Sequence, residues 1–566
     1  MNSEFRNLAL TIALSMIILF SWQYFYERPR QEEVSQKISA ARQEEIKKEA
    51  KESLSTYQPV EKNEEKVVDK HVAIKNDRIS GYISTKGLRF ASVDLLSYKE
   101  RISPDSPPVK LLSDLDEKPY FAEFGFIAKD GKVIVPDGNS VWSTQQTEIA
   151  PKSPAIFTWK NSQNIEFKVE ISLDENYLFT IKQTVRNTSS EAIHISNYGR
   201  INRAYDLVDK TMSVSFEGAT GVFDESLKEL SYENLLEEGK EAFNNVNKGW
   251  VALTEKYWMT AIMPDDRYSF SANFTGYKKE KTDKFQVDFL SENMEIKSGQ
   301  DKTYECFLYA GAKELALIDG YEKTENFALF DRVVDFGWFY FITKPIYLLL
   351  KFFYNYLGNY GLAIIAITLL IKVLMFPMAN KSFKSMNKMK QLQPEVARLK
   401  ELYGADQVKL NSEMMALYKR HNVNPLSGCL PILIQIPVFF SLYKVIYISI
   451  DMRQAPFYGW IRDLSIPDPT SVTNLFGLLP YEPFPILTIG VLPILMGISM
   501  YVQQRLSPEP ADPIQAKVMK FLPLIFLFLF SGFPSGLLLY WTVSNVISIA
   551  QQFILLKTAG KNESRK

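Results

Sequence analysis

A run of 36 residues without one charged side chain, Phe521 to Leu556, is the strongest constraint on what this chain can fold into. As a single helix it would be about 54 Å long, at roughly 1.5 Å per residue. The hydrocarbon core of a bilayer is only about 30 Å thick. The run must therefore turn back on itself, and Phe533-Pro534-Ser535-Gly536 has the residue types of a turn. This predicts an integral membrane protein with two spans here, of which the first is short.

Four other stretches are long and apolar enough to cross a bilayer, for which a helix needs roughly 20 mostly apolar residues. They run from Asn7 to Tyr26, Leu357 to Ala379, Leu426 to Ile450 and Phe484 to Gln504. Together with the two arms of the long run, they predict six membrane spans. The first stretch ends in bulky aromatic side chains, whereas a cleavable signal peptide needs small residues there. We therefore expect residues 1–26 to be an uncleaved N-terminal anchor.

The charges between the spans predict which loops are cytoplasmic, because Lys and Arg are enriched in short cytoplasmic loops. The segment from Asn380 to Pro425 holds nine basic and four acidic residues, and the tail from Lys557 to Lys566 holds four and one. The segment from Asp451 to Pro483 holds two basic and four acidic residues. We expect both termini and the two basic segments to be cytoplasmic. The long region after the first span is then external.

Most of that external region, residues 71–326, has the pattern of an all-β sandwich domain. From Asn164 to Asn187, apolar and polar side chains alternate on both sides of Asp174-Glu175-Asn176, which is typical of a β-hairpin. The same alternation recurs at Phe285 to Phe289 and at Tyr304 to Tyr309. Because regular helical patterns are scarce in this region, a sandwich is the simplest architecture.

The external region begins and ends with segments of different character. Residues 27–70 are mostly charged and polar, which indicates a solvated tether. Residues 327–356 are rich in aromatic side chains but are interrupted by five charged ones. We expect them to form a linker helix in the outer membrane interface, with a partly buried linker helix as the alternative.

Residues 380–423 have the pattern of a cytoplasmic helical hairpin. Apolar residues at alternating spacings of three and four form a coiled-coil seam, with Met389, Leu392, Val396, Leu399 and Tyr403 on one arm and Leu410, Met414 and Leu417 on the other. Gly404-Ala405-Asp406 separates the arms, and Pro394 predicts that the first arm is kinked or restarts there. We expect a docking site, although the Lys-rich outer face is also compatible with a solvated face or one resting on anionic lipid.

One charge, Lys372, lies deep in a predicted span, about 10 Å from its end by helix rise. Its ammonium either snorkels to the interface along its own alkyl chain or faces a wet cavity between helices. Other polar residues in the spans favour the cavity, although each could instead hydrogen-bond another helix: Thr368, Gln435, Thr542, Ser544 and Asn545. Lys444, which is nearer the outer end of its span, is expected to snorkel.

Other classes of site are poorly supported. The two cysteines, Cys306 and Cys429, lie in regions of different character, and there are only three histidines, so no disulfide framework, metal or cofactor is expected. The basic and acidic residues balance at 65 each, which argues against a nucleic-acid protein. Four tryptophans of the β-domain could stack on a sugar, although core packing is the commoner role: Trp142, Trp159, Trp250 and Trp258.

Several ordered motifs of the membrane region resemble those of the YidC/Oxa/Alb family of membrane insertases. They are Asn424-Pro425-Leu426-Ser427-Gly428-Cys429-Leu430-Pro431 with Ile434-Gln435-Ile436-Pro437-Val438-Phe439, Met414-Met415-Ala416-Leu417-Tyr418-Lys419, Arg453-Gln454-Ala455-Pro456-Phe457, and Phe533-Pro534-Ser535-Gly536-Leu537 with Tyr540, Trp541, Ser544 and Asn545. The resemblance is strong from about Gly361 to Gln552, and extends to the anchor and the β-domain by layout only.

The resemblance implies a bacterial inner-membrane insertase whose five-helix core, residues 357–556, surrounds a hydrophilic groove open to the cytoplasm and the lipid. It implies that nascent inner-membrane proteins enter the lipid there, alone or with the Sec translocon, and that the hairpin and residues 557–566 meet the ribosome and targeting machinery. Lys372 stands at the position of the family's groove arginine, and keeps the charge without the planar guanidinium fork. The other expected groove residues are Thr368, Gln435, Trp541 and Asn545.

Insertion through such a groove needs no chemical step, so we expect no enzyme activity. Two other functions are kept as alternatives. A small-solute transporter could use the same intramembrane charge, but the chain has no internal repeat between its halves. A membrane-anchored envelope enzyme would need a cleft with paired carboxylates in the β-domain.

Overall fold

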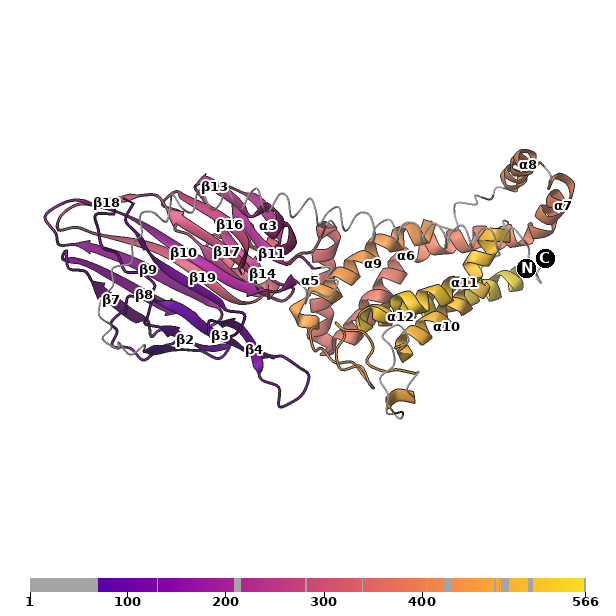
Figure 1. Ribbon diagram of the computed structural model, residues 1–566. Helices are drawn as coiled ribbons and strands as arrows, with labels where there is room; N and C mark the ends of the chain where they lie inside the picture. The colour runs from indigo at the N-terminus through magenta and orange to yellow at the C-terminus, as the bar shows by residue number, and fades with distance from the viewer. Residues whose placement is uncertain are drawn as a thin grey trace. The chain divides into compact units, whose positions relative to one another are not determined.

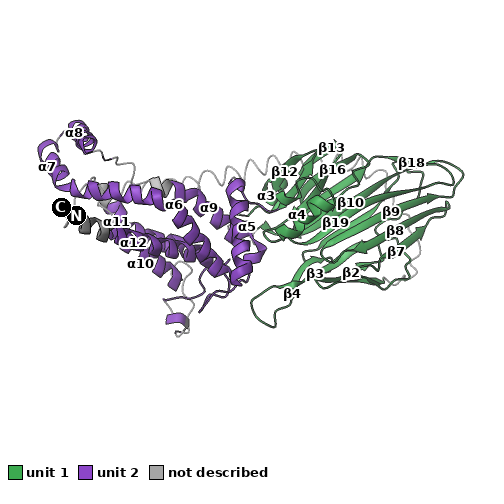
Figure 2. Ribbon diagram, turned by 180° about the vertical axis from the view of Figure 1, so that it is seen from behind, with its two compact units in different colours: residues 1–333 green, residues 334–566 purple. Residues whose placement is uncertain are grey.

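The computed structural model describes residues 70–129, 131–207, 215–279, 282–337, 339–404, 406–421, 423, 430–472, 475–477, 479, 488–506 and 513–563 (Figure 1). The predicted anchor and residues 27–69 of the tether lie outside these residues, as do residues 426–429 of the third predicted span, 484–487 of the fourth and 564–566 of the basic tail. The described residues fall into two compact units that divide after Val333 (Figure 2).

The first unit is built from two antiparallel-rich sheets. In the described residues, eleven strands form the larger sheet in the order β13-β16-β17-β10-β5-β4-β3-β2-β1-β6, with β18 paired to β10. They are β1 His71–Lys75, β2 Ile79–Ser84, β3 Arg89–Lys99, β4 Pro108–Ser113, β5 Tyr120–Ile127, β6 Glu148–Ile149, β10 Ile193–Tyr205, β13 Lys240–Val246, β16 Phe270–Lys279, β17 Thr282–Ser291 and β18 Met294–Ile296. The smaller sheet has the order β12-β11-β14-β15-β19-β9-β8-β7. Its strands are β7 Ala155–Lys160, β8 Ile165–Leu173, β9 Leu178–Asn187, β11 Gly218–Phe223, β12 Ser226–Ser231, β14 Gly249–Thr254, β15 Trp258–Met263 and β19 Asp301–Ala312.

The predicted hairpin is confirmed in β8 and β9, which pair antiparallel with Val169 opposite Gln183. Every second side chain of β8 is buried, because alternate residues of a strand point to opposite faces. The turn is held by Asp174, whose carboxylate accepts hydrogen bonds from the backbone N–H groups of Asn176 (2.8 Å) and Leu178 (3.0 Å). The two shorter stretches of alternation also prove to be strands, in β17 and β19.

The core of this unit lies between the two sheets. The ring of Phe90 in β3 is 5.1 Å from that of Phe179 in β9, and Phe126 in β5 is 4.9 Å from Phe167 in β8. These edge-on aromatic contacts join one sheet to the other, which confirms the sandwich. The described part of the unit also contains the short helices α3 Tyr232–Glu238 and α4 Leu315–Thr324 and the 3-10 turn η3 Phe330–Val333.

The second unit is helical. Its elements are α5 Tyr340–Leu357, α6 Tyr360–Gln391, α7 Gln393–Tyr403, α8 Gln407–Arg420, α9 Leu430–Ile448, η5 Ile450–Met452, η6 Leu475–Gly477, α10 Val491–Leu506, α11 Pro513–Leu529, η8 Phe530–Gly532 and α12 Ser535–Glu563. By length and hydropathy, two helical segments among the described residues could cross a membrane, Tyr360–Gln391 and Ser535–Leu555, and Ile434–Ile448 is a shorter apolar helix.

The turn predicted inside the long apolar run is confirmed. Helix α11 ends at Leu529, η8 follows, Phe533 is extended, and α12 begins at Ser535. Helix α11 begins at Pro513, eight residues before the apolar run, and its 17 residues are still short for a span, as predicted. Lys517 and Lys520 therefore belong to this helix, since the tendency to continue a helix does not end where the apolar composition ends.

The linker helix begins later and α6 ends later than predicted. Helix α5 begins only at Tyr340, and a left-handed Gly358 followed by Asn359 separates it from α6. The Asn359 side chain accepts a hydrogen bond from the Leu362 N–H (3.1 Å) and so caps α6. Helix α6 then continues past Ala379 to Gln391, into the segment expected to form the first arm of the hairpin.

The hairpin itself consists of α7 and α8. The chain restarts a helix at Gln393 with Pro394 in its first turn, where the missing N–H of proline costs no hydrogen bond. The buried residues are Leu392, Val396, Leu410, Leu417 and Val423, whereas Met389, Leu399, Tyr403 and Met414 are half-buried. The predicted seam is therefore confirmed on both arms.

Candidate functional site

Helices α6 and α12 lie side by side because a glycine allows them to approach closely. A β-carbon added to Gly536, near the start of α12, would lie 3.2 Å from Cδ1 of Ile364 in α6. The hydrogen bond between Lys372 and Ser548 joins the same two helices farther along. Because both contacts advance along the two helices in the same sense, α6 and α12 run parallel, as Figure 1 also shows.

A polar seam, which we define as Thr368 and Lys372 of α6 with Asn545, Ser548 and Gln552 of α12, follows this pair of helices. Lys372 donates a hydrogen bond from Nζ to Oγ of Ser548 at 3.0 Å. Ser548 is buried, whereas Lys372 is half-buried. Among the described residues no carboxylate forms an ion pair with Lys372. A cation in this seam is thus held by a neutral hydroxyl group.

Thr368 lies one turn before Lys372, as predicted, but its hydroxyl proton is already donated in a hydrogen bond within its own helix. It donates to the carbonyl oxygen of Ile364 in its own helix at 2.6 Å, and the residue is 1% exposed. This bond satisfies a hydroxyl group that would otherwise be buried without a partner. Thr368 therefore offers the seam only a spare lone pair.

Asn545 joins α12 to α10, and among the described residues its hydrogen bond goes to Ser499 rather than to Lys372. Its Nδ2 donates to Oγ of Ser499 at 3.0 Å, and that hydroxyl in turn donates to the Met496 carbonyl at 2.7 Å. Both Asn545 and Ser499 are buried. Helix-to-helix hydrogen bonding, which was the alternative to a groove role, thus accounts for this side chain.

Gln435 and Trp541 belong to the packing between α9, α11 and α12. The Gln435 amide donates to the hydroxyl of Tyr540. The Trp541 ring lies 4.9 Å from that of Phe439 in α9 and 4.7 Å from that of Phe530 in η8. In the described residues, neither side chain forms a hydrogen bond with Lys372. The structure therefore separates the five predicted groove residues into three local arrangements.

Ser548 and Gln552 were not among the predicted site residues. Gln552 lies one turn after Ser548 and is 6% exposed, and its Oε1 has no hydrogen-bond donor among the described residues. Leaving such a buried acceptor unsatisfied costs about 1–3 kcal/mol, so the position calls for water or another donor. A helical spacing of three and seven residues from Asn545 was the signal that would have identified both.

Lys444 does not simply snorkel into the interface. Its Nζ forms an ion pair with Oδ2 of Asp335 at 2.6 Å, and both side chains are about one-fifth exposed. Nearby, Lys351 of α5 pairs with Asp451, which also accepts a hydrogen bond from the Tyr347 hydroxyl at 2.6 Å. Because the Asp335 carboxylate neutralises it, the Lys444 ammonium does not have to reach the lipid headgroups to be stabilised.

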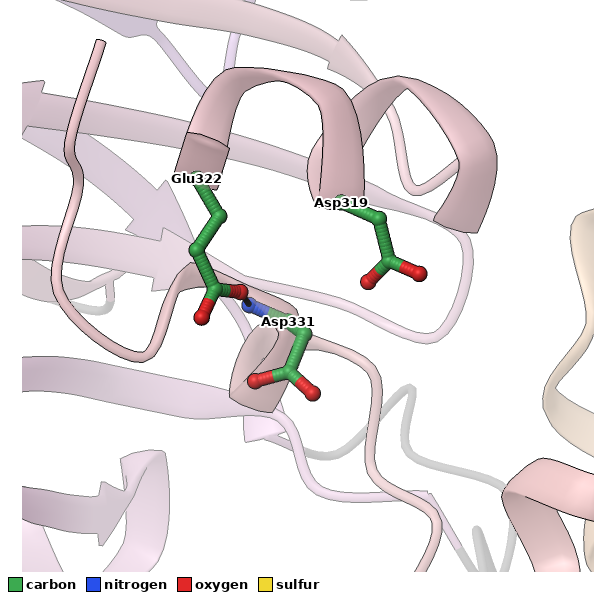
Figure 3. Close-up of side chains that lie close together, drawn as sticks. All are labelled: Asp319, Glu322 and Asp331. Atoms are coloured by element: carbon green, nitrogen blue, oxygen red, sulfur yellow. Dashed lines mark hydrogen bonds between the residues drawn. The ribbon is translucent and has the colours of Figure 1, made fainter. Parts of the chain in front are cut away.

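The β-unit contains a cluster of three carboxylates that sequence spacing did not predict. The carboxylate oxygens of Asp319, Glu322 and Asp331 lie within 4.8 Å of one another (Figure 3). Two local contacts help to explain why these carboxylates lie close together. Glu322 accepts a hydrogen bond from the Asp331 N–H at 3.1 Å, and Nε of Arg332 lies 3.7 Å from Oδ1 of Asp331. The cluster carries no assigned ligand.

The tryptophans of this unit mainly pack inside it. Trp250 is fully buried and donates from Nε1 to the Ala328 carbonyl at 2.9 Å, and Trp142 is 4% exposed. Trp159 packs against Phe167, with ring centroids 5.7 Å apart. Core packing is therefore the role that these contacts support, rather than a platform for a sugar.

A cavity of about 330 Å³ in the same unit is lined by Asp265, Arg267, Glu305 and Phe307 among others. Arg267 holds the Asp265 carboxylate with two hydrogen bonds, at 2.8 Å and 2.5 Å, and the backbone N–H of Glu305 donates to it at 3.1 Å. Burial alone would raise the pKa of Asp265, but these hydrogen bonds outweigh it and lower that pKa below its ordinary value.

An antiparallel β-sandwich followed by a bundle of apolar helices, with one cation between two of them, defines a polytopic membrane protein with a large external domain. Residues 71–349 match the family described as the YidC periplasmic domain, and residues 352–562 match the 60Kd inner membrane protein family. The chain belongs to the YidC family of membrane protein insertases. It is an inner-membrane protein with a periplasmic domain, and an insertase rather than an enzyme.

Two curated relatives support this assignment along 98% of the chain. The chain is 47% identical to the membrane protein insertase YidC of Rickettsia felis over 559 residues, which cover 98% of this chain and 100% of the relative. The corresponding protein of Rickettsia prowazekii is 46% identical over 558 residues, with the same coverage. A crystal structure of an active YidC insertase covers 86% of this chain and 92% of its own, with a TM-score of 0.35 and 16% identity.

Proposed function

We propose that this chain inserts nascent inner-membrane proteins by drawing the polar, translocated tail of the substrate to the polar seam, with Lys372 as the attracting charge. The observation that carries the proposal is the Lys372 ammonium, bonded to the hydroxyl of Ser548 and to no carboxylate of the described residues. A charge at such depth is costly and is usually kept for function. A positive charge that no carboxylate of the described residues neutralises would attract the acidic tail of a substrate.

The strength of this attraction depends on the surroundings. Two unit charges 4 Å apart attract by about 1 kcal/mol in water but by about 4 kcal/mol at the effective dielectric constant of a protein surface. An acidic side chain is therefore attracted more strongly in the seam than in the cytoplasm. The substrate's own apolar segment then provides the driving force as it enters lipid, so no chemical step is needed.

Hydration of the seam also lowers the barrier to the polar tail. Buried oxygens without a donor among the described residues occur at Gln552 and at Thr542 of α12, and at Asn380 of α6. Each is a position where water or a substrate N–H group would be stabilised. These acceptors support a wet path between the helices. Gln435, Trp541 and Asn545 would then shape its walls through their contacts with α9, α11 and α10.

We further propose the following division of the chain. Residues 1–26 anchor it, residues 27–70 form the tether, residues 71–326 form the periplasmic sandwich, and residues 327–356 form the linker. Residues 357–556 form the core with the hairpin at 380–423, and residues 557–566 form a basic tail.

The exposed basic side chains of the hairpin, among them Lys409, Lys419 and Arg420, support contact with the ribosome, the targeting machinery or anionic lipid. Cooperation with the Sec translocon rests on the family resemblance.

The test is insertion of model substrates that differ only in the charge of the translocated tail, measured by protease protection. Lys372→Ala is expected to lower insertion of acidic tails roughly three- to tenfold, which corresponds to about 1 kcal/mol. This is less than the full attraction of about 4 kcal/mol, because the uncharged polar groups still hydrate the tail. Neutral tails should be affected less, because the uncharged polar groups remain. Lys372→Arg keeps the charge and adds donors, so it should insert both substrates at least as well as the parent.

The comparison between tails separates attraction from general damage. A variant that merely folds badly would lose both substrates equally. If Lys372→Ala inserts acidic and neutral tails as well as the parent protein does, the charge has no role in insertion and the proposal is wrong.

A further inference from the structure

The side chain of Lys372 leans along the seam rather than straight across it. Taking the close contact between Ile364 and Gly536 as a common level, Lys372 lies eight residues farther along α6, and Ser548 lies twelve residues farther along α12. A difference of four residues between parallel helices is about 6 Å of rise. The ammonium therefore reaches toward the C-terminal ends of both helices. On the predicted topology this is the cytoplasmic side.

A snorkelling lysine would extend its ammonium in this same direction. In this structure the ammonium lies at the hydroxyl of Ser548. A lysine stem is long and flexible enough to carry its ammonium several ångströms toward water. Here the ammonium ends on a buried hydroxyl, with 3.0 Å between Nζ and Oγ. One helical turn farther along α12 lies Gln552, which is buried and whose Oε1 has no donor among the described residues.

We propose that Ser548 is a positioning residue that sets the depth of the Lys372 charge, and that the ammonium shifts toward the side of Gln552 when the Ser548 hydroxyl is lost. The hydrogen bond to Ser548 keeps the ammonium inside the seam. Without it, the ammonium loses this acceptor and can shift toward the cytoplasmic side within the reach of its own stem. A charge at that level no longer meets an acidic tail at the depth where the tail is hardest to solvate. This inference rests on the proposed function of Lys372.

The first experiment measures the ratio of insertion of an acidic-tail substrate to that of a neutral-tail substrate in the full-length protein. Ser548→Ala is expected to lower this ratio roughly two- to tenfold, the range that one hydrogen bond of about 0.5–1.5 kcal/mol sets. Ser548→Thr retains a hydroxyl and should keep the parent ratio. Ser441→Ala is the matched control, because it removes a buried hydroxyl of α9 that has no partner among the described residues.

The second experiment reports the position of the amine directly. The protein is reconstituted into liposomes, and a membrane-impermeant, amine-reactive reagent is applied from the cytoplasmic side. The rate of modification at Lys372 is then followed by mass spectrometry of its peptide. Ser548→Ala should raise this rate severalfold, whereas Ser548→Thr and Ser441→Ala should leave it at the parent value. If the alanine variant fails to accumulate, Ser548→Cys keeps the size but offers only a weak acceptor.

The outcomes separate this inference from the proposed function. A parent-like ratio and a parent-like modification rate in both the alanine and the cysteine variants would show that Ser548 only packs, and would overturn the inference. If Lys372→Ala still loses acidic tails, the proposed function stands alone. If Lys372→Ala has no effect on either tail, the proposed function fails first, and the modification rate still decides whether Ser548 holds the amine.

Discussion

The ammonium of Lys444 in α9 lies 2.6 Å from the carboxylate of Asp335, which precedes α5. A second ion pair, between Lys351 of α5 and Asp451, forms just after α9. Two separate ion pairs thus join the segment that contains α5 to the segment that contains α9. The position of α5 follows from these side chains as well as from its aromatic composition, which was the only basis for predicting an interfacial helix.

Breaking the first of these pairs should destabilise the helical unit. Lys444→Met removes the ammonium that lies 2.6 Å from the carboxylate of Asp335, whose side chain is 22% exposed, so we expect a loss of about 1–3 kcal/mol. The double variant with Asp335→Asn should lose less than the sum of the single variants, because the two residues are coupled. Thermal unfolding in detergent measures this. Lys110→Met is the control, since its pair with Asp116 is about half exposed on both sides.

Membrane topology provides an independent prediction. Cysteine placed at Lys390, an exposed residue near the end of α6, should react only with a reagent on the cytoplasmic side. Cysteine placed at Pro469, which is also exposed, should react only from the periplasmic side. Asp468 itself is unsuitable, because its carboxylate accepts the Leu492 N–H at 2.8 Å at the start of α10. Labelling of both positions from one side would exclude the six-span topology.

The cytoplasmic hairpin should be separable from the core. Replacing residues 392–421 by a short Gly-Ser linker removes α7 and α8, whose buried residues pack mainly against each other, so the thermal stability of the remainder should hardly change. Insertion should fall, because the proposed docking surface is gone. Thermal unfolding and protease protection together test this. A variant that cannot be purified folded would show that the hairpin is structural.

The ion pair of Asp265 predicts the response of the β-unit to acid. Since its folded pKa lies below the unfolded value, the charged carboxylate contributes stability that is present above about pH 4 and is lost as pH falls through the folded pKa. In Asp265→Asn this contribution should be missing at all pH values. The melting temperature of the variant should therefore lie below that of the parent at pH 6, and the difference should shrink toward pH 3. A constant difference would contradict the assignment.

The membrane region shows what can be inferred from a sequence and what cannot. The turn at Phe533 to Gly536 was predictable because length and local residue type decide it. The depth of Lys372 within its span stays a prediction from helix rise. Its partner was not predictable, because Ser548 lies 176 residues away and only helix packing brings them together. For the same reason, the Asp335 partner of Lys444 left no sign in the local pattern.

The sequence by itself determined which segments are strands and which are apolar helices, because periodicity and apolar length act over a few neighbouring residues. It also indicated a cation in a span. Only the tertiary structure decided that β10 lies between β5 and β17. It also decided that Asn545 donates a hydrogen bond to Ser499, and that the Lys372 ammonium donates to Ser548 rather than to Gln435. Such choices depend on which of many polar groups come within about 3 Å after the helices and sheets have packed, and that distance is set by the whole fold.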